Sequence, residues 1–475
     1  MSRPVVVTAS ATLASPPAEV WPLVTDTDRT NRLMFGQPAV YRPIEEGARS
    51  SARFVVETKT SGWSMEYEEA PFEWTQNKSF SVYRRMRSGP LRSYTYGITL
   101  DPAPDGGTRL SVRLELEPRH WALRPVVQLQ GRRVVDGMAK LAAEIDAHLR
   151  DRAPSPYLKP TSPANEERLA YAERELVERG LPRDAVTVVL ELVRSGPDAD
   201  LVRVRPFELA ARHGLDGRET LRTLLHAVTL GVFELRWALV CPSCRTASDQ
   251  VSSLGQIEEH GHCQLCDLTY GVELDRAVEA TFRPHPSVRE VHDRMFCIGG
   301  PWRTPHVIVQ ANVEGGGTRG VEAPREPGRY RLFARGGTVA SVEVAADAPK
   351  EARVRLDEAF EPAEVTVAPE GTVLVTNASG EPLHVKIERL GYATLAATAH
   401  LVTTMDEFRR LFSRDLLKPS TPLKVASCAI LFSDLTGSTA LYTKAGDAAA
   451  FRLVDDHFDV LREAIGAAGG TVVKT

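Results

Sequence analysis

The pattern of apolar and polar positions divides the first 152 residues into a strand, a helix, a series of strands and one long helix. "VVVTASATL" predicts the first strand, and "SPPAEVWPLVTD" predicts a helix with Ser15 as its N-cap. Strand-like segments follow, and in the last of them, "RLSVRLELEP", apolar and polar residues alternate, so that one face is expected to be buried. That face consists of Leu110, Val112, Leu114 and Leu116. An amphipathic helix is expected from about 121 to 149.

These elements follow one another in the order of the helix-grip fold, and residues 1–152 resemble the START and polyketide-cyclase-like (SRPBCC) superfamily. The resemblance implies a sheet wrapped around the long helix, often with an apolar cavity, and hence a hydrophobic small-molecule ligand. A filled core or a protein-binding module is the alternative, because a fold does not by itself imply a function. Five aromatic residues are candidates either for the cavity wall or for an ordinary core: Trp63, Tyr67, Trp74, Tyr83 and Tyr94.

A proline-rich segment, 153–165, predicts a semi-rigid linker, and a helical pattern then continues to about residue 240. Within 166–240, a helix, a tight turn, a second helix and a strand resemble a winged helix-turn-helix. Arg218 and Arg222 on the second helix of this pair are candidates for contact with DNA. No cluster of basic residues surrounds them, so a structural winged helix is favoured and nucleic acid is not expected as a partner.

Two C-x-x-C pairs, "CPSC" and "CQLC", are separated by eighteen residues. Two such knuckles can bring four thiolates to one tetrahedral Zn²⁺, which predicts a zinc ribbon over residues 241–281. Four cysteines leave no coordination position for water, so the expected role is structural. A redox pair is the weaker alternative, because redox motifs occur singly beside a βαβ pattern. The predicted ligands are Cys241, Cys244, Cys263 and Cys266.

The neighbouring His260 and His262 are then expected not to bind the metal, and Cys297 and Cys428 are expected to be small buried residues.

Short strands separated by Gly and Pro turns between 282 and 400 predict a small β-sandwich, in which no catalytic constellation is evident. A helix at 403–417 lies within a connecting segment, 401–422.

Residues 423–475 contain the sequence motif that indicates a chemical function most clearly. "ASCAILF" predicts a fully buried strand, and Asp434 lies just past its end. A turn at Gly437 precedes a helix that Ser438 or Thr439 is expected to cap, which is a geometry that binds anions. A carboxylate beside such a turn can hold Mg²⁺ and, through it, the phosphates of a nucleotide. A capping or turn aspartate is the alternative for Asp434 taken alone.

"ILFSDLTGST", the following helix, the Gly-Gly turn and "VVKT" resemble the first part of class III nucleotide cyclases, whose catalytic domain is ferredoxin-like. The resemblance implies that Asp434 and the carbonyl of Leu435 bind Mg²⁺ or Mn²⁺, with Asp434 as the catalytic carboxylate. It also implies that Gly437, Ser438 and Thr439 hold the triphosphate of ATP. Lys474 matches the position that reads the purine base, where a lysine donor suits the N1 acceptor of adenine.

The whole arrangement resembles a multidomain α+β bacterial adenylate cyclase, in which residues before about 420 sense or regulate and the complete catalytic domain forms a homodimer. The implied reaction converts ATP to cyclic AMP and pyrophosphate with two metal ions. The second metal carboxylate of the family would follow Thr475, so the 475-residue chain is expected not to make cyclic AMP. The alternative is a ligand- or DNA-responsive regulator built on the START-like, winged-helix and ribbon modules.

The composition of the chain bears on its expected partners and location. The net charge of −4 gives no general attraction to nucleic acid or to anionic membranes. No apolar run approaches the roughly 20 residues of a membrane span. Four of the six cysteines lie in the two knuckles rather than in a disulfide pattern, so a cytoplasmic location is expected.

Overall fold

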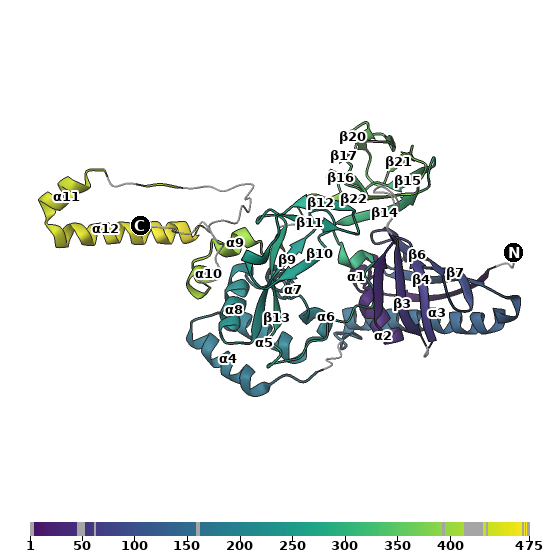
Figure 1. Ribbon diagram of the computed structural model, residues 1–475, viewed down its shortest axis with the longest axis horizontal. Coiled ribbons are helices and arrows are strands. Elements are labelled where there is room, and N and C mark those ends of the chain that lie inside the picture. The colour runs from purple at the N-terminus through teal and green to yellow at the C-terminus, as the bar shows by residue number, and fades with distance from the viewer. Residues whose placement is uncertain are drawn as a thin grey trace.

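The N-terminal unit is an antiparallel sheet that wraps around one long helix. In this computed structural model, the structure describes residues 4–44, 53–60, 63–157, 162–391, 395–412, 431–433, 436–467, 470 and 472. The elements of the unit are β1 (Val5–Leu13), α1 (Pro17–Val24), α2 (Thr27–Phe35), β2 (Ala39–Pro43), β3 (Phe54–Thr60), β4 (Trp63–Glu69), β5 (Glu73–Thr75), β6 (Ser79–Met86), β7 (Leu91–Pro102), β8 (Thr108–Pro118) and α3 (Arg124–Asp151). Figure 1 shows α3 lying across these strands.

Helix α3 packs closely against strands β1 and β8. A Cβ atom at Gly131 would lie 2.7 Å from Leu116 Cδ1 and 3.0 Å from Val7 Cγ2, so only glycine fits without movement of those side chains. The alternation expected in β8 is confirmed, because its four apolar residues are all buried. The N-cap expectation is wrong: Pro16 occupies that position in α1, and the backbone amide of Ser15 instead donates to Asp146 of α3.

The middle of the chain combines a helical unit with the four-cysteine ribbon around one core. Its elements are α4 (Glu166–Glu178), α5 (Arg183–Ser195), α6 (Asp198–Leu201), α7 (Pro206–His213), α8 (Gly217–Thr229), β9 (Phe233–Val240), β10 (Ala247–Val251), β11 (His260–Cys263), β12 (Leu268–Gly271) and β13 (Val278–Pro284). Strand β13 pairs with β9 along its whole length, so the expected boundary at residue 281 falls inside a strand of this unit. A buried ion pair between Arg289 and Asp198, 2.9 Å apart, holds the following segment against the helices.

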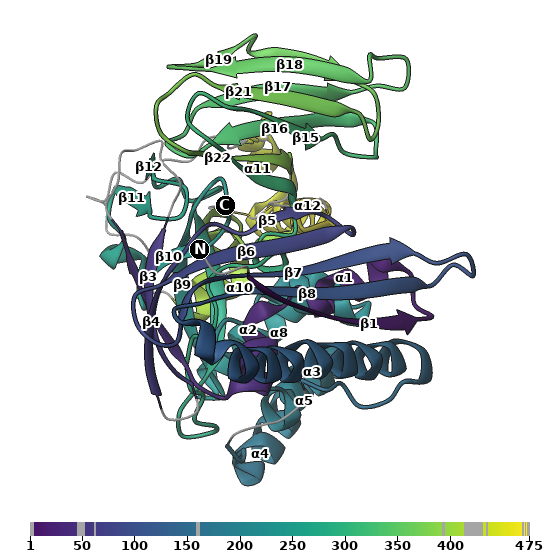
Figure 2. The same cartoon turned by 90° about the vertical axis from the view of Figure 1, so that its right-hand side faces the viewer.

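Nine further strands form two sheets that share a hydrophobic core, and Figure 2 shows them stacked above the helix-grip domain. They are β14 (Val307–Val313), β15 (Thr318–Glu322), β16 (Gly328–Ala334), β17 (Val339–Val344), β18 (Glu351–Leu356), β19 (Phe360–Glu361), β20 (Glu364–Val367), β21 (Thr372–Asn377) and β22 (Leu383–Arg389). One sheet runs in the order β14-β22-β16-β17-β20, and the other in the order β15-β21-β18-β19. We refer to residues 307–389 as the β-sandwich.

The β-sandwich is joined to the helix-grip domain through its backbone. Strand β14 pairs with β5 at Val309 with Thr75 and at Gln310 with Trp74, so both units contribute to one 13-stranded sheet. The indole of Trp74 adds a hydrogen bond of 3.0 Å to the carbonyl of Val307. These contacts join segments more than 230 residues apart in the chain.

The last described elements are α9 (Ala399–Thr403), α10 (Asp406–Leu411), α11 (Ser438–Ala445) and α12 (Asp447–Ala467). The helix expected from 403 to 417 is interrupted, because Met405 is extended and α10 begins after it. Leu431 and Phe432, expected at the end of a buried strand, are exposed and outside any described strand, since no described strand pairs with them. Helices α11 and α12 pack together, and Figure 1 shows this pair apart from the other elements.

We predict that Gly131→Ala lowers the stability of the N-terminal unit by about 1–2 kcal/mol, because its Cβ would overpack the contact with β1 and β8. Gly137 provides a matched control in the same helix, where a Cβ would meet only the flexible end of Met34 at 3.3 Å. Gly137→Ala should raise stability by up to about 1 kcal/mol, since alanine is the better helix former. Urea titrations of the two variants measure the difference, and equal midpoints would contradict the close packing at Gly131.

Candidate functional site

The four knuckle cysteines meet at one point. Their Sγ atoms all lie within 4.8 Å of one another, and all four residues are buried. A tetrahedral site with Zn–S bonds of about 2.3 Å needs sulfur atoms roughly 3.8 Å apart, so only a small contraction would close the shell around a metal ion. The sulfurs of Cys244 and Cys263 are already 3.6 Å apart. The cluster expected from the spacing is therefore assembled, and its donor set suits Zn²⁺.

The two knuckles have the same local geometry. The residue after the second cysteine of each knuckle has a positive φ, 59° at Arg245 and 48° at Asp267. This left-handed turn is uncommon for residues other than glycine, and its repetition indicates that the cluster requires it. In the first knuckle the amide of Ser243 also donates to Cys241 Sγ at 3.4 Å. Neither predicted bystander, His260 nor His262, belongs to the described cluster of sulfur ligands.

The β-sandwich holds the second knuckle. Lys386 of β22 is buried and donates from Nζ to Cys266 Sγ at 3.3 Å. The backbone amide of Gly336 donates to the Cys266 carbonyl at 2.9 Å, and the Arg335 guanidinium lies 3.3 Å from the Asp267 carboxylate. Hydrogen bonds from the other three cysteine thiols, together with the Lys386 ammonium, hold the pKa of Cys266 well below its ordinary value. A thiolate is the form that binds a metal ion.

The first knuckle is held through Ser243, both by Glu388 of the β-sandwich and by His306 directly before it. His306 Nε2 donates to the Ser243 carbonyl at 2.6 Å, and Ser243 Oγ donates to the buried carboxylate of Glu388 at 3.3 Å. Burial lowers the pKa of His306 to about 4, so the imidazole is neutral at pH 7. Arg331 Nε completes the pairing of Glu388 at 2.6 Å. Outer hydrogen bonds of this kind orient the ligands of a metal site.

Sequence reasoning did not find these supporting residues. In "LHVKIER", the polar positions alternate with apolar ones, which is the pattern of a strand with one face in water. In the structure this polar face is turned to the ribbon, and Lys386 and Glu388 are 3% and 0% exposed. No local signal distinguishes such a face from an ordinary exposed one, because the contacts come from residues more than 100 positions away.

A cavity of about 70 Å³ lies where the helix-grip domain, the ribbon and β22 meet. Apolar side chains form much of its wall: Phe54, Phe72, Trp74, Leu265 and Ile298. Two polar groups in the wall, His384 Nε2 and Thr304 Oγ1, are buried and have no hydrogen-bond partner among the described residues. Burial lowers the pKa of His384 to about 3, so this imidazole is neutral as well.

The inner face of the helix-grip sheet, which faces α3, contains a buried polar centre near this cavity. Arg84 donates to Glu69 at 2.7 Å and to the Tyr94 hydroxyl at 2.7 Å, and its guanidinium lies over the ring of Tyr67. Burial raises the pKa of Glu69 despite the attraction of Arg84. The hydroxyl of Tyr41 is buried without a partner among the residues described here. Cross-strand pairing places all these residues on the same face.

The aromatic residues expected around one cavity are not all brought together. Tyr67 and Tyr94 lie on the inner face beside Arg84, whereas Trp74 lines the cavity at the junction. Tyr83 is 47% exposed, and the side chain of Trp63 lies outside the described residues. The alternation of β6 places Tyr83 on the outer face, opposite Arg84.

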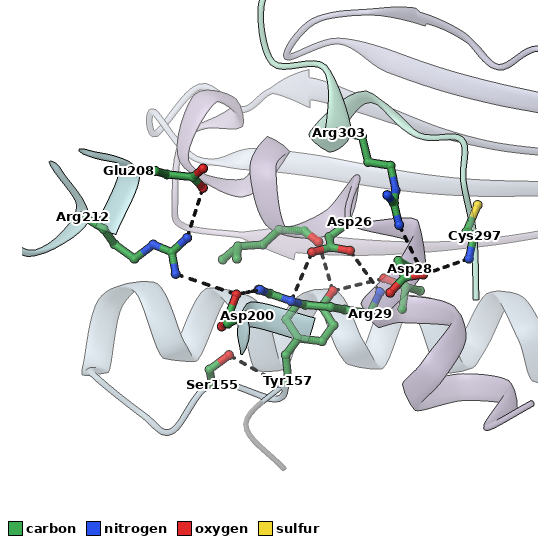
Figure 3. Close-up of polar contacts among 12 residues, drawn as sticks. Asp26, Asp28, Arg29, Ser155, Tyr157, Asp200, Glu208, Arg212, Cys297 and Arg303 are labelled. Atoms are coloured by element: carbon green, nitrogen blue, oxygen red, sulfur yellow. Dashed lines mark hydrogen bonds and ion pairs between the residues drawn. The ribbon is translucent and has the colours of Figure 1, made fainter. Parts of the chain in front are cut away.

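A network of polar contacts, shown in Figure 3, ties α2 to the helical unit and to residues 295–303. Arg29 pairs with Asp200 of α6, and its guanidinium lies 5.4 Å from the ring centre of Trp302. The Asp28 carboxylate accepts hydrogen bonds from the backbone amides of Phe296 and Cys297 at 2.8 and 3.0 Å. Segment 295–303 is therefore fixed to the helix-grip domain.

Other contacts strengthen this attachment. The Thr27 hydroxyl donates to the Gly299 carbonyl at 2.7 Å, and the Ala39 amide donates to the Met295 carbonyl at 2.8 Å.

Cys297 is buried, as expected, and burial raises the pKa of its thiol to about 11. Cys428, the other cysteine expected to be buried, lies outside the described residues.

The second helix of the expected winged helix, α8, is engaged within the protein. Arg222 Nε lies 3.0 Å from Glu407 of α10, and Arg222 Nη1 lies 2.8 Å from Glu219. Arg218 also has an interaction partner. These contacts agree with a structural role for this helix pair, and the winged-helix assignment itself stays a prediction.

The predicted nucleotide residues are only partly within the described chain. Asp434, Leu435 and Lys474 lie outside it. Gly437 has a φ of 77° and is itself the N-cap of α11, so the expected cap by Ser438 or Thr439 is wrong. Those two residues begin the helix, and their side chains are not among those described.

Within the described ranges, no helix is both long and apolar enough to cross a membrane.

Residues 4–146 match the family described as polyketide cyclase / dehydrase and lipid transport, which supports the START-like assignment of the N-terminal region. Residues 174–295 match a family of unknown function, DUF5939. That family spans both the helical unit and the ribbon, which share one core in the structure.

Similar solved structures cover about a third of this chain. The protein TTHA0849 from Thermus thermophilus is 22% identical, with 31% of this chain and 99% of that chain covered and a TM-score of 0.24. A START superfamily protein from Mycobacterium smegmatis is 14% identical, with coverages of 31% and 99% and a TM-score of 0.23. The Zhui aromatase/cyclase from Streptomyces sp. R1128 is 12% identical, with coverages of 32% and 98% and a TM-score of 0.24. No curated protein matches the chain.

Proposed function

We propose that the protein is a class III adenylate cyclase in which residues 423–475 contribute the first metal-binding segment and the preceding domains regulate it. The observation that carries this proposal is the motif "ILFSDLTGST", followed by a helix and "VVKT". Asp434 and the Leu435 carbonyl would hold Mg²⁺ or Mn²⁺, and Lys474 would read adenine. The left-handed Gly437 at the start of α11 supports the proposal, because a glycine turn before a helix suits phosphate. The complete catalytic domain would form a homodimer.

The regulatory part, in this proposal, senses a hydrophobic small molecule through the START-like domain. The inner face of its sheet carries large apolar and aromatic side chains together with a few convergent polar groups at Arg84 and Tyr41. Ligand sites in proteins commonly combine these features. The connection to the rest of the chain runs through the β5–β14 pairing and through segment 295–303.

The four-cysteine cluster is proposed to bind one structural Zn²⁺ and to fix the junction of the regulatory domains. Four thiolates fill a tetrahedral shell, so the ion would have no open position for catalysis. Lys386 would offset part of the negative charge of the metal–thiolate group. The ribbon then connects the helical unit to the β-sandwich.

A ligand- or DNA-responsive regulator is the second candidate, and the contacts of α8 argue against its DNA-binding form. Arg222 is held by two glutamates, Glu219 and Glu407, one of which comes from another helix. An arginine paired in this way is poorly placed to neutralise a DNA phosphate.

We predict that the purified protein contains one zinc ion per chain and that Cys244→Ser abolishes it, because three thiolates leave the shell incomplete. Removal of the metal with a chelator should also lower the melting temperature, since metal binding contributes to folding free energy. Elemental analysis and thermal unfolding measure these effects. Cys297→Ser is the matched control, because this cysteine is also buried but does not belong to the cluster, so the variant should retain full metal content. Full zinc content in Cys244→Ser would contradict the proposed site.

We predict that Asp434→Asn weakens Mn²⁺-dependent binding of a fluorescent ATP analogue about tenfold, because one carboxylate ligand of the metal is lost. The control is Asp456→Asn, at an exposed position of α12, which should bind like the unmodified protein. Equal affinities in both variants would refute the assignment of Asp434.

We predict that Lys474→Glu reverses the base preference of this binding from ATP toward GTP, since a carboxylate can accept the N1–H of guanine. Competition by unlabelled ATP and GTP against the fluorescent analogue measures the preference. An unchanged ratio of the two inhibition constants would show that Lys474 does not read the base.

A further inference from the structure

Leu265 occupies an unusual position, between the two cysteines of the second knuckle. It packs against the core of the helical unit and ribbon, and also against the inner-face cluster of the helix-grip domain around Phe54 and Met86. It is only half-buried, and its side chain lines the junction cavity. One leucine of the ribbon therefore contacts the cavity and the interior of the helix-grip domain at the same time.

The charged groups of the cavity wall already have partners. Glu69 is paired with Arg84, Lys386 donates to Cys266, and Arg303 lies 3.6 Å from Asp28. The polar groups that lack a partner among the described residues are His384 Nε2 and Thr304 Oγ1, and both are buried. A neutral imidazole and a hydroxyl suit a hydroxyl or carbonyl group of a ligand, whereas a charged group would find no free counter-charge here.

We propose that the junction cavity binds an uncharged, mainly apolar molecule with one hydroxyl or carbonyl group, and that Leu265 is a cap that larger ligands displace. The polar group would meet His384 and Thr304, and the apolar part would extend past Leu265 toward the inner face. The proposal deepens the sensor role suggested above and rests on it.

The size of the cavity is the reason for assigning a displaceable cap. A volume of about 70 Å³ has room for roughly five water molecules, whereas sites for drug-sized ligands measure about 300–1,000 Å³. Ile298 also lines the cavity, but its segment is fixed to the helix-grip domain by Asp28 and Thr27. The half-buried side chain of Leu265 is therefore the part of the wall that yields, and its displacement shifts its neighbour Cys266.

The first test compares binding of Nile red, an uncharged dye with a carbonyl group, to zinc-loaded 475-residue variants. Leu265→Ala should bind the dye about tenfold more tightly than the unmodified protein, because binding no longer requires displacement of the cap. Leu265→Trp, which fills the cavity, should bind more weakly. The control Leu268→Ala alters a half-buried leucine of β12 that does not line the cavity, and should leave the affinity unchanged.

The polar anchor is tested with His384→Leu combined with Thr304→Val, which should weaken Nile red binding in the Leu265→Ala background about tenfold. Anilinonaphthalene sulfonate, an anionic dye, should gain less from Leu265→Ala than Nile red does. Equal Nile red affinities in unmodified protein, Leu265→Ala and Leu268→Ala would overturn the cap. A greater gain for the anionic dye would overturn the assigned ligand class.

The second test measures the rate at which a coloured chelator removes zinc. Saturating Nile red should accelerate release severalfold in the unmodified protein, because the displaced cap moves the second knuckle. An unchanged rate at full dye occupancy would overturn the coupling of ligand to ribbon. If the protein holds no metal, the zinc proposal fails by itself, while the dye affinities of the Leu265 variants still decide whether the cap exists.

Discussion

The convergence of four buried sulfur atoms within 4.8 Å of one another is the constraint on which the central part of the structure depends. The ribbon consists of two knuckles and three short strands, which is too small a unit to bury a sufficient core alone. It is completed from outside: the helical unit shares its core, and the β-sandwich accepts a hydrogen bond from Ser243 and donates hydrogen bonds to Cys266. The cluster therefore holds together three parts of the chain as well as two knuckles.

The same junction makes the domains dependent on one another. Backbone pairing of β5 with β14 extends the helix-grip sheet into the β-sandwich, and the β-sandwich in turn is hydrogen-bonded to the ribbon. The segment after β13 returns to α2, where the carboxylate of Asp28 receives two backbone amides. Because protein interiors are dense and resist local deformation, we expect a change at any one of these contacts to shift the residues packed against it. This connectivity suits a regulatory assembly better than a set of independent modules.

Much of the fold follows from local pattern. Strict alternation in β8 and the long amphipathic repeat of α3 predicted the elements of the helix-grip unit, and the spacing of the cysteines predicted the cluster. Finer features were missed. A proline and an acidic partner on α3 replaced the expected Ser15 cap, and the extended backbone at Met405 moved the start of the helix expected at 403 to residue 406. Such details depend on long-range tertiary contacts, which routinely override the intrinsic helix propensity of the residues.

The sequence by itself determined the order of the elements in the helix-grip unit, the buried face of β8 and the four cysteines that come together in one cluster, because periodicity and the spacing of cysteines are local properties. Only the tertiary structure decided which polar residues would be buried. Lys386 and Glu388 carry the pattern of a solvent-facing strand surface, yet they support the cysteines from the interior. Likewise, Leu265 reads as an ordinary residue between two knuckle cysteines, but it reaches the core of another domain. Periodicity records that a face is polar or apolar, whereas the partner of that face is set by chain segments more than a hundred residues away.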